Sequence, residues 1–312
     1  MTKQLSRRGW FGASAAVASA AARAARGESP MKKDPFTYCL NTSTIRGQNL
    51  SIVEEIDLAS RAGFQAIEPW IGELDKHVQS GGKLKDLAKR IGDAGLAVAS
   101  AIGFPQWIVD DETQRRKGLE EAKRNMDLVR QIGGKRLAAP PAGAQDRGEI
   151  PLAQITERYR ALLELGDKLE VVPQLELWGF SKTLNRLGDV MHVAMDVDHP
   201  KACILLDVYH LYKGGSGFTG IRLLGPGTMF CFHMNDYPSK PKQSTITDAH
   251  RVYPGDGVAP LMQILHDLVG IGFQGALSLE LFNRDYWKQD ALHVVKTGLE
   301  KMKAAVRTAR AS

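Results

Sequence analysis

From residue 36 onward the chain alternates short β-rich runs with longer amphipathic segments, and this alternation constrains the fold more than any other feature of the sequence. Such an alternation indicates parallel strands joined by helical crossovers. We expect strands at residues 37–41, 66–69, 97–101, 136–139, 173–177, 203–207, 229–234 and 276–281. We expect helices at residues 50–62, 83–94, 112–132, 152–170, 183–195, 219–224, 259–270 and 287–309. Eight strand–helix pairs within residues 36–310 predict a single-domain α/β protein, a (β/α)8 TIM barrel.

The positive charge of the chain is concentrated at its N-terminus. The formal net charge is +6, and residues 1–26 carry five Lys or Arg residues and no acid, which leaves +1 (6 − 5) for the remainder. A nearly neutral barrel offers little to a phosphate backbone, so we expect no nucleic-acid partner. The sequence is compatible with a homo-oligomer.

The first 26 residues resemble a twin-arginine export signal. Arg7 and Arg8 precede Gly9-Trp10-Phe11 and a run of small and apolar residues. The resemblance implies an exported, periplasmic protein, whereas a basic tail without signal function would leave the protein in the cytoplasm. No later segment has the ~20 uninterrupted apolar residues that a membrane-spanning helix needs, so we expect no membrane contact in the mature form.

Cys39, Cys203 and Cys231 are far apart in the sequence, form no C-x-x-C pair and lie inside apolar runs. We therefore interpret all three as buried free thiols rather than disulfide partners or metal ligands.

Four expected strands carry an ionisable residue near the C-terminal end, where catalytic groups of such barrels gather. They are Glu176, Asp207, His233 and Glu280. A buried, ionised and unpaired carboxylate is costly, and one shared divalent cation would be a partner for all four residues. Three carboxylates and one imidazole favour Mn²⁺, Mg²⁺ or Co²⁺, with Zn²⁺ as an alternative.

The spacing of these residues supports their convergence. Asp207 follows Glu176 by 31 residues and His233 follows Asp207 by 26, each about one strand–helix pair. Glu280 follows His233 by 47 residues, and we interpret the polar segment 236–256, 21 residues long, as a loop over the barrel mouth. Without that loop the last interval is again 26 residues.

Several motifs that contain these residues resemble the xylose-isomerase-like sugar isomerase/epimerase family. They are Leu175-Glu176-Leu177-Trp178, Leu206-Asp207-Val208-Tyr209-His210, His233-Met234-Asn235-Asp236, Pro254-Gly255-Asp256-Gly257 and Ser278-Leu279-Glu280. The resemblance covers essentially the whole chain after the leader. It implies that Glu176, Asp207, His233 and Glu280 bind the metal, that Glu176 and Glu280 act as acid and base, and that His210 contacts the substrate.

At two places the chain departs from the ketose 3-epimerases of that family, which carry an acidic residue after the first ligand and an arginine after the histidine ligand. Here these places read Gly179-Phe180-Ser181-Lys182 and Tyr237-Pro238-Ser239-Lys240. Lys182 is a candidate substrate contact or a solvated lysine, and Arg251 is a candidate substrate contact or a loop-stabilising cation.

Two further kinds of residue could contact a substrate. Glu68 ends the second strand and could hydrogen-bond a substrate hydroxyl or a ligand histidine. Aromatic rings that follow strands could stack on a sugar ring or pack at the rim of the barrel; they are Trp70, Phe104, Trp107 and Trp178.

A site of this kind suits abstraction of a proton beside a carbonyl group, with an enediolate as the intermediate. We therefore expect a metal-dependent isomerase or epimerase of a sugar or keto-sugar. A dehydratase or lyase of a keto-sugar or inosose would use the same residues. A non-catalytic sugar-binding protein and a DNA repair enzyme with a multi-metal barrel are further alternatives, although the latter would need a histidine-rich cluster.

Overall fold

The structure is a computed structural model that describes residues 35–146 and 150–311. The expected export signal, residues 1–26, lies outside the described residues. The described strands are β1 (Thr37–Asn41), β2 (Ala66–Glu68), β3 (Ala97–Val98), β4 (Arg136–Ala139), β5 (Val172–Glu176), β6 (Ile204–Asp207), β7 (Met229–Met234) and β8 (Ala276–Leu279). The α-helices are α2 (Ile52–Ala62), α3 (Ile71–Gln79), α4 (Leu84–Asp93), α5 (Glu112–Gln131), α6 (Leu152–Leu169), α7 (Leu187–Asp196), α8 (Val208–Lys213), α9 (Leu261–Gly270) and α10 (Ala291–Ala311). Short 3₁₀ helices are η1 (Thr42–Gln48), η2 (Thr219–Leu223), η3 (Asp248–His250) and η4 (Tyr286–Lys288).

The eight strands form one parallel sheet in the order β3-β2-β1-β8-β7-β6-β5-β4. Two backbone hydrogen bonds join its ends. The amide of Ala101, just beyond β3, donates to the carbonyl of Arg136 at 3.2 Å, and the amide of Ala138 donates to the carbonyl of Ala101 at 2.9 Å. The expected barrel is therefore confirmed, with a seam between β3 and β4 that rests on Ala101.

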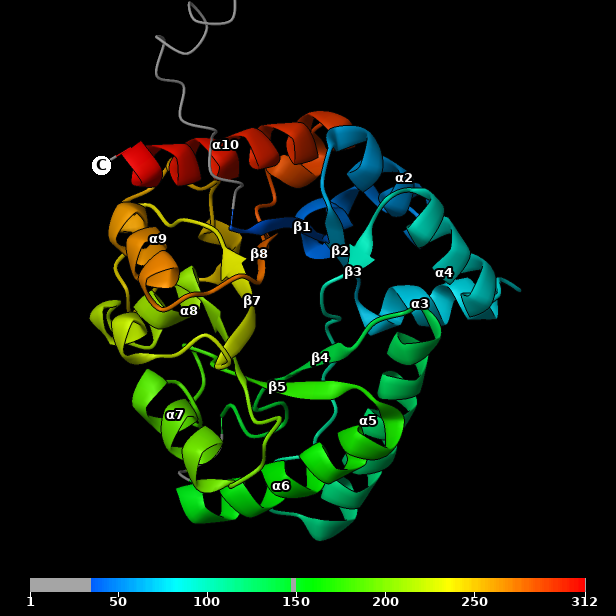
Figure 1. Ribbon diagram of the computed structural model, residues 1–312, viewed down its shortest axis with the longest axis vertical. Coiled ribbons are helices and arrows are strands. Elements are labelled where there is room, and N and C mark those ends of the chain that lie inside the picture. Colours follow the sequence, from blue (N-terminus) through cyan, green and yellow to red (C-terminus); the bar gives the residue numbers. More distant parts are fainter. Residues whose placement is uncertain (1–34, 147–149, 312) are drawn as a thin grey trace, which may run out of the picture. The chain divides into compact units, whose positions relative to one another are not determined.

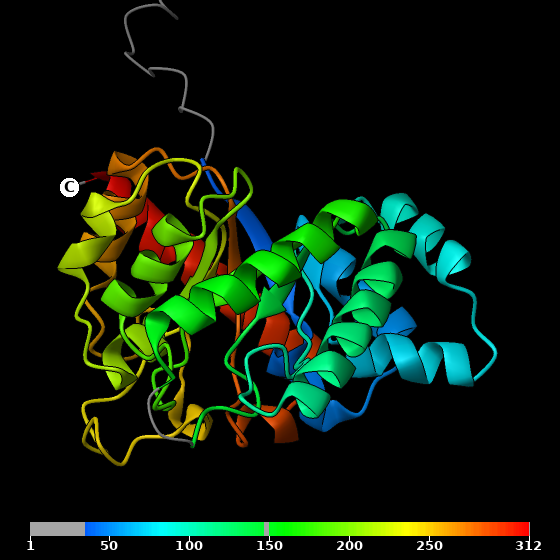
Figure 2. The same cartoon turned by 90° about the horizontal axis from the view of Figure 1, so that it is seen from below.

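The helices surround the strands (Figure 1). Helix α10 packs against α9 and α2 on one side of the barrel, and α5 packs against α6 on the opposite side. Figure 2, a view turned by 90°, shows α5 and α6 side by side again. Among the described residues, no helix is long and apolar enough to cross a membrane.

Alternate strand residues point into the barrel and fill it with small side chains. An inner cluster contains one residue from each of six strands: Cys39, Ala66, Ala138, Leu205, Cys231 and Ala276. All three cysteines are buried and free, as predicted. Because side chains on a strand alternate between its two faces, residues two positions further along point inward as well. The barrel interior therefore continues toward its C-terminal end through Asn41, Glu68, Asp207, His233 and Ser278.

The strands lie within two residues of their predicted bounds, except that β3 ends at Val98 rather than at 101. Among the α-helices of the described residues, α3 and α8 were not predicted. Helix α3 gave a weak signal because it carries only a thin apolar stripe. Helix α8 begins directly after β6, because the side chain of Asp207 accepts a hydrogen bond from the amide of His210 and caps the helix. The helix predicted at 219–224 is wrong in type, since the chain forms the 3₁₀ helix η2 there.

Candidate metal centre and catalytic cavity

The strand ends place the four predicted metal ligands at one end of the barrel. Glu176 and Asp207 are the last residues of β5 and β6, His233 is the second-last residue of β7, and Glu280 directly follows β8. Asp207 is paired with His233 across the β6–β7 ladder, and His233 is paired with Ser278 across the β7–β8 ladder. The sequence-predicted set therefore converges on the inner face of the last four strands.

Three of the four residues form a compact ligand set. Nδ1 of His233 lies 3.1 Å from Oε2 of Glu280 and 3.8 Å from Oδ2 of Asp207. One ligand atom from each of these residues lies within 4.8 Å of the other two, and all three side chains are buried. Glu176 stands slightly apart, and its buried Oε2 atom has no hydrogen-bond partner in the described protein. An imidazole nitrogen, carboxylate oxygens and one unsatisfied buried oxygen together fit a divalent cation.

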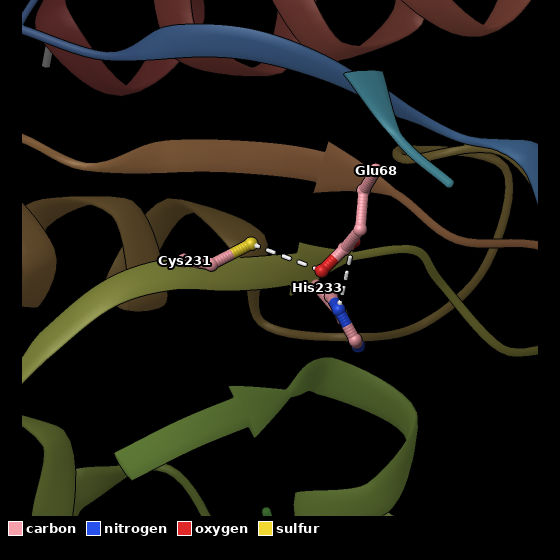
Figure 3. A group of neighbouring side chains, drawn as sticks. All are labelled: Glu68, Cys231 and His233. Atoms are coloured by element: carbon pink, nitrogen blue, oxygen red, sulfur yellow. Dashed lines mark hydrogen bonds and ion pairs between the residues drawn. The ribbon is translucent and has the colours of Figure 1, made fainter. Parts of the chain in front are cut away.

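The other nitrogen of His233 faces Glu68 of β2. Nε2 lies 3.1 Å from Oε2 of Glu68, and both side chains are completely buried. That Glu68 oxygen also accepts hydrogen bonds from Asn41 at 2.9 Å and Ser278 at 2.7 Å. Figure 3 shows Glu68 reaching across to His233, with the thiol of Cys231 3.8 Å from the other Glu68 oxygen.

Glu68, Cys231 and His233 thus form a second group that could ligate a metal. Burial raises the pKa of Cys231 to about 12, with the Glu68 carboxylate adding to the effect. A metal-binding cysteine must be a thiolate, and Glu68 already has three partners. This group is therefore better described as a support for His233, in which Glu68 is held by hydrogen bonds and faces the imidazole as an ion-pair partner.

Arg251 brings a buried cation between the carboxylates. Its Nη1 atom donates to Oδ2 of Asp207 and to Oε2 of Glu280, both at 2.7 Å, and its Nη2 atom donates to Asp248 at 2.5 Å. The side chain of Arg251 is completely buried. Arg251 lines the cavity and also forms an ion pair within its own loop, so the geometry is compatible with both interpretations and the substrate contact stays a prediction.

The loop that carries Arg251 is held to the barrel by Asp236. An antiparallel bridge pairs Asp236 with Val252. The Asp236 carboxylate accepts hydrogen bonds from four backbone amides, those of Tyr237, Gly255, Gly257 and Ala259. A Cβ atom on Gly257 would lie 2.3 Å from this carboxylate. Glycine is required there, which gives the Pro254-Gly255-Asp256-Gly257 motif a structural reason.

The two glutamates of the site have opposite electrostatic environments. Burial raises the pKa of Glu176 to about 8, with Glu280 and Asp207 adding to the effect. Burial alone would also raise the pKa of Glu280, but His233 and Arg251 outweigh it and lower that pKa below its usual value. A carboxylic acid and a carboxylate therefore stand in the same site near neutral pH.

A cavity of about 230 Å³ opens over these residues. Of the residues that the sequence suggested for the site, those that line it are Glu176, Glu280, His210, Arg251, Trp70, Phe104 and Trp178. Burial lowers the pKa of His210 to about 4, with Arg251 contributing, so the imidazole is neutral and can accept or donate one hydrogen bond.

Three of the predicted substrate contacts do not line the cavity: Glu68, which lies against His233, and also Lys182 and Trp107. Lys182 is exposed and its Nζ atom donates to the carbonyl of Asp146 at 3.3 Å, so of its two interpretations the solvated lysine agrees with the geometry. Trp107 is fully buried in the core, where its ring packs 6.0 Å from that of Tyr159.

Several residues of the site were not singled out from the sequence. Asn235 donates to Oδ2 of Asp207 at 2.9 Å, and Asn41 donates to Glu280 at 3.2 Å as well as to Glu68. Asn41 ends β1, so the strand-end rule that found the ligands would have found it too. Asp248 and Ser278 carry no such signal, because their roles depend on loop geometry and on register.

A second cavity, of about 370 Å³, lies outside the barrel among η1, α2 and α3. It is lined by Glu55 and Glu73 together with Arg46 and Lys76. Oε2 of Glu55 has no hydrogen-bond partner among the described residues. Burial, with the nearby Glu73 carboxylate, raises the pKa of Glu55 to about 9.

Comparison with known proteins agrees with this architecture. An inosose isomerase of Bacillus velezensis is 26% identical over 274 residues, which cover 86% of this chain and 96% of that protein. An L-ribulose 3-epimerase of Mesorhizobium japonicum is 26% identical over 72% of the chain and 73% of its own length. A 3-dehydroshikimate dehydratase of Pseudomonas putida is 23% identical over 75% of the chain, which spans 36% of that longer protein.

Among solved structures, the IOLI protein with a binding zinc atom superposes with a TM-score of 0.81 at 22% identity, covering 88% of this chain and 99% of the other. This likeness shows the fold. The model of the xylose isomerase-like TIM barrel family matches residues 56–305. The chain therefore belongs to the xylose isomerase-like TIM barrel family.

Proposed function

We propose that this protein is a divalent-metal-dependent isomerase or epimerase that acts on a sugar or keto-sugar through an enediolate. The observation that carries the proposal is the pair Glu176 and Glu280, two buried carboxyl groups that line one cavity and whose pKa values are shifted in opposite directions. Such a pair is typical of sites that take a proton from one position and return it at another.

Each residue has its own role in the proposed reaction. Glu280, whose Oε2 atom accepts a hydrogen bond from Arg251, removes the proton from the carbon beside the carbonyl group. Glu176 is the proton donor on the other side of the cavity, and burial raises its pKa in the metal-free protein. Return to the same carbon from the opposite face epimerises the substrate, whereas delivery to the neighbouring carbon interconverts an aldose and a ketose. The neutral imidazole of His210 and the indole of Trp178 line the cavity and orient the sugar.

The metal would be held by Asp207, His233 and Glu280, with Glu176 as the fourth ligand. When bound, it would polarise the substrate carbonyl and stabilise the negative charge that develops on the oxygen atoms. The mainly oxygen donor set favours Mn²⁺, Mg²⁺ or Co²⁺, and a zinc atom is present in the related IOLI structure.

A dehydratase or lyase of a keto-sugar or inosose is the second candidate. Relatives named 3-dehydroshikimate dehydratase favour it, because the same proton abstraction becomes an elimination when the neighbouring carbon carries a leaving group. Product analysis separates the two reactions, since only elimination loses water or an alcohol.

The test is to incubate the Mn²⁺-loaded protein with an inosose and, separately, with L-ribulose in deuterated water. We expect a new isomer, epimer or elimination product, or deuterium on the carbon beside the carbonyl, detected by NMR. Some isomerases recycle the same proton, so product formation counts without deuterium. The absence of both product and exchange with either compound would contradict the proposal.

A further inference from the structure

Aromatic side chains form a continuous row around most of the mouth of the catalytic cavity. Successive ring centroids lie 5.9 Å apart for Phe282 and Trp70, 5.1 Å for Trp70 and Phe104, 5.7 Å for Phe104 and Trp178, and 5.0 Å for Trp178 and Phe180. We call these five rings the collar. They come from the segments that follow four different strands, β2, β3, β5 and β8, yet each ring touches the next.

Two polar residues complete the circle. The ring of Phe180 lies 5.6 Å from that of His210, and Nε2 of His210 lies 3.2 Å from Nη2 of Arg251. The guanidinium carbon of Arg251 lies 5.0 Å from the ring centroid of Phe282. All of these residues line the same cavity.

The cavity changes character with depth. Its floor is polar and buried, since Glu176 and Glu280 are each 4% exposed. Its rim is apolar and open to solvent, since Phe104 is 37% exposed and Phe180 is 43% exposed. Phenylalanine rings at the rim can make no hydrogen bond to a hydroxyl group, so a hydroxyl buried against them would lose its hydration without compensation. A contiguous exposed apolar surface beside a polar site marks a place where an apolar group binds.

We propose that the substrate of this enzyme is a keto-sugar that carries an apolar ring substituent, a glycoside with an aromatic group rather than a free sugar. The polar floor holds the reacting sugar, and the collar stacks on the substituent. Aromatic rings recognise one another through offset and edge-to-face contacts at the distances that the collar itself shows. The inference rests on the proposed function, because that function places the reacting sugar on the floor.

Binding of two probes that differ only in the ring tests the inference without turnover. These are phenyl β-D-glucopyranoside and methyl β-D-glucopyranoside, titrated into the full chain and followed by calorimetry and by the fluorescence of Trp70 and Trp178. We expect the phenyl compound to bind about 10-fold more tightly, as two stacking contacts of ordinary strength would give. Equal affinities, or no saturable binding of the phenyl compound at millimolar concentration, would overturn the inference.

Variants locate the effect. Phe180→Leu keeps apolar bulk and removes the ring, and Phe104→Leu does the same across the mouth. Each should lower the ratio of the two affinities by about 3-fold or more. Leu223→Ala, at an exposed apolar position on η2, is the matched control and should leave the ratio unchanged. An unchanged ratio in both phenylalanine variants would place the phenyl group elsewhere.

Two other outcomes are distinguishable. A lower molar mass of either phenylalanine variant in light scattering would show that a second copy of the chain covers the collar, and would overturn the inference. Deuterium exchange into a free keto-sugar without any preference for the phenyl probe would leave the proposed function standing and remove the inference alone. Ring-dependent binding without any exchange or product would show that the collar binds an aromatic group and would count against the proposed function.

Discussion

Oε2 of Glu68 lies 3.1 Å from Nε2 of His233, and neither side chain is exposed to solvent. A carboxylate this close to Nε2 would hold the imidazole proton on that nitrogen when Nδ1 ligates a metal. Nδ1 is the atom that faces Asp207 and Glu280. Glu68 is therefore a positioning residue, which sets the tautomer and the ring orientation of the proposed histidine ligand.

Replacement of this carboxylate should weaken metal binding. We expect Glu68→Gln to lower the affinity for Mn²⁺ by about 10- to 100-fold, as is usual when the outer partner of a histidine ligand is lost. Calorimetric titration of the metal-free protein measures it, and Glu157→Gln, at an exposed position on α6, is the control. An affinity equal to that of the parent protein would show that His233 does not depend on Glu68.

The ligands themselves should be indispensable. Asp207→Ala and His233→Ala should each abolish stoichiometric metal binding, because the remaining groups cannot complete a site. Metal content per chain is measured after purification and metal loading. Asp248→Asn removes a neighbouring carboxylate that contacts only Arg251 of the site residues, and it should keep one metal ion per chain. Normal metal content in both alanine variants would refute the ligand assignment.

The acid–base pair should be separable from the metal site. Glu176→Gln and Glu280→Gln retain a coordinating amide oxygen, so both should bind metal, yet each should lose about 10²- to 10⁴-fold in turnover. The measurement is kcat with whichever compound the parent enzyme converts, together with metal content of the same samples. Near-normal turnover in both variants would contradict the proposed roles.

The sequence predicted the barrel and the convergence of four residues because both follow from periodicity. Strand alternation places Glu176, Asp207 and His233 on one face, and parallel strands bring their ends together. What the sequence could not predict depends on contacts between distant segments. The position of Lys182 depends on how the chain turns after β5, and the burial of Arg251 depends on a loop of 21 residues that is held by Asp236.

The collar is a second feature that the sequence could not predict, because it depends on contacts between distant segments. Trp70, Phe104 and Trp178 were visible as aromatic residues after strands, but Trp107 has the same sequence context and is buried in the core. Phe180 gave no signal, since it lies in a segment noted only for lacking an acidic residue. Ring-to-ring contact among residues of four strand ends is a property of barrel closure, which no local pattern encodes.

Glu55 should make the stability of the protein depend on pH. Its pKa is raised to about 9 by burial, so the folded state keeps a proton that the unfolded state releases above about pH 4.5. Stability from this group is complete below the unfolded pKa and falls as pH rises toward 9, by up to about 1.4 kcal/mol per pH unit. Urea unfolding at pH 5 and pH 8 should therefore show the parent protein losing stability relative to Glu55→Gln. A difference that does not change with pH would contradict the raised pKa, and Glu157→Gln is again the control.

The N-terminal leader, residues 1–26, predicts where in the cell the protein is located. We propose that Arg7 and Arg8 direct export of the folded protein, so replacement of both by lysine should retain it in the cytoplasm. Fractionation of cells that express the full chain, with immunodetection in the periplasmic and cytoplasmic fractions, measures this. Unimpaired export of the double variant would show that another feature of the leader is recognised.

The barrel wall has fewer backbone hydrogen bonds at Ala101 than between its other neighbouring strands. Elsewhere neighbouring strands share a ladder, but β3 and β4 are joined through one residue. Phe104 stands three positions beyond that residue and belongs to the rim of the mouth. This seam lies on the side of Phe104, whereas Asp207 and His233 lie on β6 and β7, which are joined to each other and to β8 by strand ladders. The seam with the fewest backbone hydrogen bonds and the strands that carry the proposed metal ligands are thus in different parts of the barrel wall.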